Sequence, residues 1–130
     1  MKLRIKGDSF RLRISPGEMN RLLESGRIAE TIRFGPQPHE KLTYALLTNS
    51  DQTSPDSAMT IRYRLQEITV LVPAQQARSW ANGSQVGIYA EVNTGDAQLE
   101  LAVEKDFACL DKNEAENQDT FPNPKQGTAC

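Results

Sequence analysis

Aromatic residues, cysteine and histidine are all scarce in this chain of 130 residues. Aromatics make up 6% of the sequence, so the core is expected to rest on Leu, Ile, Val and Ala. Two cysteines, Cys109 and Cys130, do not make a disulfide framework, and Cys109 is expected to be a buried structural thiol, with a nucleophile or a metal ligand as the alternative. His39 is the single histidine and lies in a loop beside Pro38, which argues against a Cys–His pair or a Ser–His–Asp triad.

Long apolar runs and an excess of positive charge are also missing. No apolar run approaches the ~18 residues of a membrane helix. Residues 1–6 alternate charged and apolar types, unlike the continuous apolar block of a signal peptide. We therefore expect a cytoplasmic protein without membrane association. The formal net charge of −2 excludes a generally basic nucleic-acid binder, so nucleic acid is not an expected partner. No phosphate-binding glycine loop or dinucleotide fingerprint occurs.

What the chain does have is an internal repeat. Two short strands, a helix and two more strands are expected between residues 3 and 48, and the same order recurs between residues 59 and 105, displaced by 57 or 58 residues. We predict a single duplicated domain over residues 1–110, with repeats at about 2–48 and 59–105. Residues 111–130 are polar and acidic and are interpreted as a C-terminal tail.

Each repeat carries recognisable helix boundaries. Ser15 and Glu18 have the spacing of a capping box, and Gly26 suits a left-handed C-terminal cap. The second helix is expected over residues 73–81 without a side-chain N-cap, and its Trp80 is expected in the core. Alternating patterns predict strands at residues 2–6, 10–14, 28–34, 42–48, 59–64, 67–72, 86–92 and 98–104.

These elements predict an α+β fold. Eight strands with short connections favour one strongly curved antiparallel sheet or barrel, built from two ββαββ repeats with the two helices on the outside. Closure into a barrel would remove the free sheet edges.

One face of the expected strands is apolar and the other is rich in cations. Because side chains alternate along a strand, the second face can be read from the sequence. Its candidate anion ligands are Arg4, Lys6, Arg11, Arg13, Arg33, Arg62 and Arg64, and its candidate metal ligands are Glu91, Glu100 and Glu104. A concave surface of this kind attracts anions and offers carboxylates to a hard metal ion. The alternative is a solvated face in which Arg–Glu pairs stabilise the sheet modestly.

Several stretches resemble a family of small, functionally uncharacterised bacterial proteins. They include Val103 to Leu110, which reads VEKDFACL, and Phe121 to Pro124, which reads FPNP. This resemblance implies no activity. The duplicated architecture also looks like the CYTH-type triphosphate tunnel enzymes, in which a barrel lined with Lys, Arg and Glu binds a triphosphate and a divalent metal. That resemblance implies Mg²⁺ or Mn²⁺ as cofactor, but the first strand here has no glutamate where that family alternates them before a lysine.

The sequence therefore leaves two functions open. The preferred one is binding of a phosphorylated or polyanionic small molecule on the Arg/Lys-lined face, with metal-assisted phosphohydrolysis as its enzymatic version and no catalytic residue identified. The alternative is a non-catalytic protein-interaction module or a homodimeric scaffold.

Overall fold

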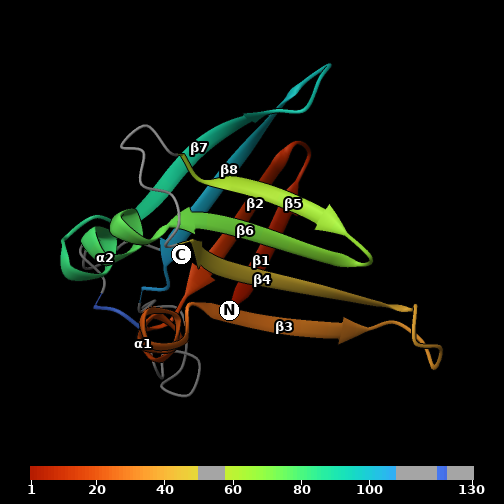
Figure 1. Cartoon of the computed structure of the whole chain (residues 1–130), viewed down its shortest axis with the longest axis horizontal. Helices are drawn as coiled ribbons and strands as arrows, with labels where there is room; N and C mark the ends of the chain where they lie inside the picture. The colour runs from red at the N-terminus through yellow and green to blue at the C-terminus, as the bar shows by residue number, and fades with distance from the viewer. Residues whose placement is uncertain (50–57, 108–119, 123–130) are drawn as a thin grey trace.

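The computed structural model describes residues 1–49, 58–107 and 120–122. Over these residues the chain is α+β, with eight strands and two helices (Figure 1). The first repeat comprises β1 (Lys2–Lys6), β2 (Ser9–Ile14), α1 (Pro16–Ser25), β3 (Arg27–Arg33) and β4 (Lys41–Asn49). The second comprises β5 (Thr60–Arg64), β6 (Glu67–Pro73), α2 (Ala74–Asn82), β7 (Gly87–Asn93) and β8 (Gln98–Lys105).

The helix boundaries follow the sequence signals. Ser15 accepts a hydrogen bond from the Glu18 backbone N–H, and the Glu18 side chain accepts one from the Ser15 N–H, so the capping box is complete. Gly26 ends α1 with φ of 81°, a left-handed conformation in which glycine pays no Cβ penalty. Helix α2 has no side-chain cap, as predicted, and its Trp80 is 1% exposed.

The strands form two separate sheets rather than one. The order in sheet A is β1-β2-β8-β7, and the order in sheet B is β3-β4-β6-β5. Outer pairs are antiparallel hairpins, but the central pairs β2·β8 and β4·β6 are parallel. The expected single antiparallel sheet or barrel is therefore wrong for the described residues, and the likeness to the CYTH barrel is not confirmed. Alternation predicts the two faces of a strand correctly but does not identify its neighbour.

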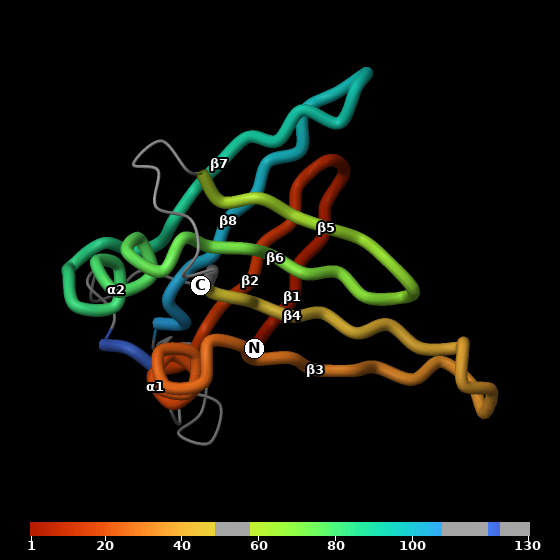
Figure 2. The backbone as a smooth tube through the Cα atoms, in the orientation of Figure 1, coloured from red at the N-terminus to blue at the C-terminus, as the bar shows by residue number. Residues whose placement is uncertain are grey.

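The two repeats are interleaved, because each sheet takes one hairpin from each repeat (Figure 2). The registers match: Ser9 pairs with Glu100 in sheet A, and the corresponding Glu67 pairs with Thr43 in sheet B. Arg27 at the start of β3 corresponds to Gly87 at the start of β7, a displacement of 60. This exceeds the predicted 57 or 58 because Gly83 is extended and residues 84–86 lengthen the connection after α2.

A single core fills the space between the apolar faces of the two sheets and the helices. Both sheets and both helices contribute to it, through Leu12, Val103, Leu46, Val70, Leu22 and Trp80 among others. The Trp80 indole N–H donates to the Val86 carbonyl at 3.2 Å, which satisfies its one buried donor. Because both apolar faces contribute to this one core, the polar faces of the two sheets point away from each other. Neither helix reaches the length and apolarity needed to cross a bilayer, in the part of the chain that the structure describes.

Candidate functional site

The sequence-predicted cation-rich face is divided between the two sheets. Arg4, Lys6, Arg11 and Arg13 lie on sheet A, whereas Arg33, Arg62 and Arg64 lie on sheet B. The three candidate metal ligands, Glu91, Glu100 and Glu104, are all on sheet A. The seven cations therefore do not converge in one shared hollow.

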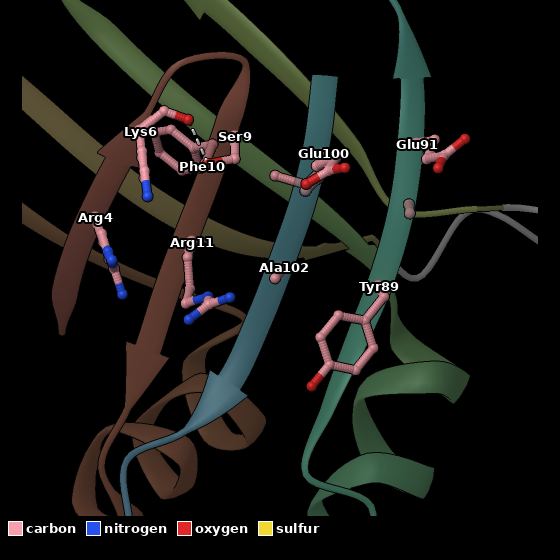
Figure 3. Close-up of a pocket in the computed structure, with 11 residues that line it drawn as sticks. Arg4, Lys6, Ser9, Phe10, Arg11, Tyr89, Glu91, Glu100 and Ala102 are labelled. Atoms are coloured by element: carbon pink, nitrogen blue, oxygen red, sulfur yellow. Dashed lines mark hydrogen bonds between the residues drawn. The ribbon is translucent and has the colours of Figure 1, made fainter. Parts of the chain in front are cut away.

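The polar face of sheet A contains a hollow of about 750 Å³ that brings together both kinds of candidate residue (Figure 3). Its charged lining residues are Arg4, Lys6, Arg11, Glu91 and Glu100. Ala102 lies between Arg11 and Tyr89, with which it pairs in register on either side. Because the Ala102 side chain is short and those of Arg11 and Tyr89 are long, Ala102 forms the floor of a depression between them. We refer to this space as the sheet A hollow.

Glu104 organises one end of the sheet A hollow. One carboxylate oxygen lies 3.0 Å from Nε of Arg11, and the other accepts a hydrogen bond of 2.7 Å from the Tyr89 hydroxyl. Partial burial raises the pKa of Tyr89 to about 12, with the Glu104 hydrogen bond and charge adding to the effect. The phenol is therefore neutral at physiological pH and holds Glu104 as a donor. Glu104 positions Arg11 and Tyr89, which line the hollow, whereas it is not itself a lining residue.

The cations occupy the side of the sheet A hollow formed by the β1–β2 hairpin. Arg4 is the cross-strand partner of Arg11, so two like charges lie opposite each other. Among the residues that the structure describes, Arg4 and Lys6 have no ion-pair partner and both are exposed. Like charges placed opposite each other destabilise a strand pair, so a bound anion would relieve their repulsion.

Carboxylates occupy the other side. Glu91 and Glu100 are direct cross-strand partners, and both are exposed. Glu104 lies four residues beyond Glu100, about 13 Å away at ~3.3 Å per residue, so it does not join them. No group of three potential metal ligands occurs among the described residues.

Sheet B provides an internal comparison for this site. Arg62 and Arg64 correspond to Arg4 and Lys6 by the register of the hairpins. The positions of Glu91 and Glu100 are taken by Thr31 and Thr43, whose hydroxyls hydrogen-bond at 2.8 Å.

The walls of the sheet A hollow are also absent from the other sheet. The positions of Arg11 and Tyr89 are taken by Thr69 and Ala29 in sheet B. The hollow that Arg62, Arg64 and Thr69 line on β5 and β6 is about 300 Å³. Sheet A therefore differs from its counterpart by added charge, added walls and added volume.

The remaining candidates lie outside the hollow. Arg13 lies two register pairs beyond Arg11, closer to the helices and opposite Glu104. His39 is exposed, as its loop position predicted. The two cysteines and residues 111–119 lie outside the described residues. Sequence reasoning did not identify Ala102 or Ser9 as lining residues, although aligning the repeats by hairpin register would have contrasted the Glu91–Glu100 pair with two threonines.

Comparison with known proteins places the chain in a family but assigns no activity. No curated protein and no solved structure gave a significant match. The model of a family of unknown function, DUF7009, matches residues 1–125. The chain therefore belongs to the DUF7009 family.

Proposed function

We propose that the sheet A hollow binds a small molecule carrying phosphate groups, with Arg4, Lys6 and Arg11 as its anion ligands. The observation that carries this proposal is the contrast with sheet B, where the same hairpin cations face threonines and the space is smaller. Solvated lysines and arginines would not require the carboxylate pair and the larger space that sheet A has and sheet B lacks. The volume is within the range of ordinary small-molecule sites, about 300–1,000 Å³.

The carboxylate pair suggests that the phosphate is bound together with a divalent cation. Mg²⁺ in proteins commonly takes one or two carboxylates, several waters and oxygens of a bound phosphate. Glu91 and Glu100 supply two carboxylates across one strand pair, and a cation between them would remove their mutual repulsion. Mg²⁺ or Mn²⁺ fits this donor set through oxygen ligands. When bound, it would neutralise phosphate charge, which is the requirement for phosphoanhydride hydrolysis.

Thermal denaturation with inorganic triphosphate, with and without Mg²⁺, tests the proposal. Binding to the folded state raises the melting temperature. The double variant Arg4→Gln/Lys6→Gln should abolish the shift. Its matched control is Arg62→Gln/Arg64→Gln, which removes the same charge at the corresponding positions of sheet B and should leave the shift intact. Equal losses in both variants would mean non-specific charge attraction and would overturn the proposal.

The metal and the chemistry are tested separately. Glu91→Gln/Glu100→Gln should remove the Mg²⁺-dependent part of the shift while leaving the part seen without metal. Release of inorganic phosphate from triphosphate in the presence of Mg²⁺ or Mn²⁺ would identify the hydrolytic version. A shift without phosphate release identifies a binding protein.

A further inference from the structure

An apolar area remains uncovered on the inner face of sheet B, away from the helices. The tips of the β3–β4 and β5–β6 hairpins extend past sheet A on the right of Figure 1. There Ile32 is 47% exposed, Phe34 69%, Tyr63 67% and Leu65 90%. Ile32 is the cross-strand partner of Leu42, and Tyr63 is the partner of Ile68. We call these six residues the distal apolar patch.

The turn that carries Leu65 is conformationally unfavourable. Leu65 and Gln66 join β5 to β6 as a two-residue loop, with φ of 48° and 60°. Such loops strongly prefer Asn-Gly because both residues are left-handed, and a leucine there is strained. The corresponding residue in the β1–β2 hairpin is Gly7, with φ of 55°. The protein therefore presents an almost fully exposed leucine where its own repeat has the expected glycine.

We infer that the distal apolar patch is a self-association surface that pairs with the same patch on a second copy of the chain. The exposed parts of the two aromatics and the aliphatic residues amount to roughly 500 Å² per copy, taking about 200 Å² for a whole aromatic and somewhat less for each aliphatic. A two-fold contact would bury roughly 1,000 Å² in total, the lower limit of a specific interface. A two-fold arrangement uses one self-complementary patch on both copies, so no second surface is required.

The placement of charges on these hairpins determines how this association should respond to salt. Arg33, Lys41, Arg62 and Arg64 lie on the hairpins that carry the patch, and all four are exposed. Because each lies next to a patch residue along its strand, these cations are on the opposite face of sheet B and point away from a two-fold contact made through the patch. The dimer should therefore depend little on salt, whereas binding of an acidic partner to these cations would weaken as salt is added.

Sedimentation equilibrium over a range of protein concentrations tests the inference. The wild type should show a monomer–dimer equilibrium whose dissociation constant changes by less than about threefold as salt is raised from about 0.05 to 0.5 M. Phe34→Ser and Leu65→Gly should each raise that constant at least tenfold. The control is Leu23→Ser, which removes another exposed apolar side chain, 40% exposed on α1, and should leave the constant unchanged.

Three results would overturn the inference. The first is a wild type that stays monomeric up to about 0.5 mM, a range in which even weak specific dimers associate. The second is a dimer whose dissociation constant the patch variants leave unaltered, since it would then use another surface. The third is an association that weakens strongly as salt is added, since charge attraction rather than apolar contact would then hold it together. Circular dichroism of each variant checks that its fold is retained, and Leu65→Gly, which relieves strain, keeps the test valid if Phe34→Ser does not fold.

Discussion

Replacing Leu65 by Asn and Gln66 by Gly should make the monomer more stable. A left-handed conformation costs an ordinary residue about 1–2 kcal/mol, and both loop positions are left-handed. Asn tolerates this conformation and Gly adopts it freely. Gly nevertheless costs about 0.5–1 kcal/mol of stability, because it loses more conformational entropy on folding than other residues. Leu65 is 90% exposed, so its removal loses little packing. The net expectation is a gain of about 1–2 kcal/mol in the free energy of unfolding.

Urea denaturation at low protein concentration measures this gain without a contribution from self-association. The midpoint should rise while the dependence on denaturant is unchanged, because the surface exposed on unfolding is nearly the same. The reverse substitution, Gly7→Leu in the corresponding hairpin, is the matched control. A Cβ at Gly7 would meet no atom within 4 Å, so only the backbone conformation is disturbed, and stability should fall by about 1–2 kcal/mol. If both variants have the same free energy of unfolding as the wild type, the turn is not strained. The argument that Leu65 occupies its position at a cost in stability then fails.

Three further predictions follow from the contacts of the fold and of the sheet A hollow. Glu104→Gln should lower the pKa of Tyr89 from about 12 by part of the distance to ~10, because burial, the larger cause, remains. Ultraviolet titration against Tyr89→Phe measures this, and an unchanged pKa would mean that Glu104 does not control the phenol. Ala102→Leu should fill the floor of the hollow and weaken triphosphate binding at least tenfold by calorimetry, and full binding would place the ligand elsewhere. Burial alone would raise the pKa of Glu18, but its hydrogen bonds with the Met1 amino group and with Ser15 outweigh burial and lower it. Glu18→Gln should therefore cost about 2 kcal/mol at pH 7. This loss of unfolding free energy should be complete above about pH 4.3, the pKa of Glu in the unfolded chain, and should shrink as the pH falls through the lower pKa of the folded state. A loss that chemical denaturation shows to be independent of pH would contradict this expectation.

The local structure could be predicted from the sequence almost completely. Strand alternation and the capping residues identify every strand and both helices to within about one residue at most ends, because these signals are local. The parallel pairing of β2 with β8 could not be predicted, since Ser9 and Glu100 meet only through the tertiary fold. Alternation is the same for a parallel and an antiparallel neighbour, so it gives the face of a residue but not its sheet.

For the candidate site, too, the sequence predicts which face of a strand a residue occupies but not which sheet that strand joins. Arg4 and Arg62 have equivalent patterns in the sequence and occupy equivalent positions, yet they lie on opposite sides of the molecule. Glu100 and Glu104 share a face of one strand, but only Glu100 reaches the sheet A hollow because the spacing along a strand separates them. Tyr89 and Ala102 contribute shape rather than charge, and shape depends on neighbours that only the fold brings together.

The exchange of hairpins between the two repeats has a consequence for how such a chain comes into being. Residues 1–49 can complete neither sheet, because β2 awaits β8 and β4 awaits β6. During synthesis the first repeat therefore cannot complete its sheets until nearly all of the second repeat has been made. Folding should be a single late event whose rate depends on forming contacts between residues distant in the sequence. A lone ββαββ unit of this design would be complete only by trading hairpins with another such unit.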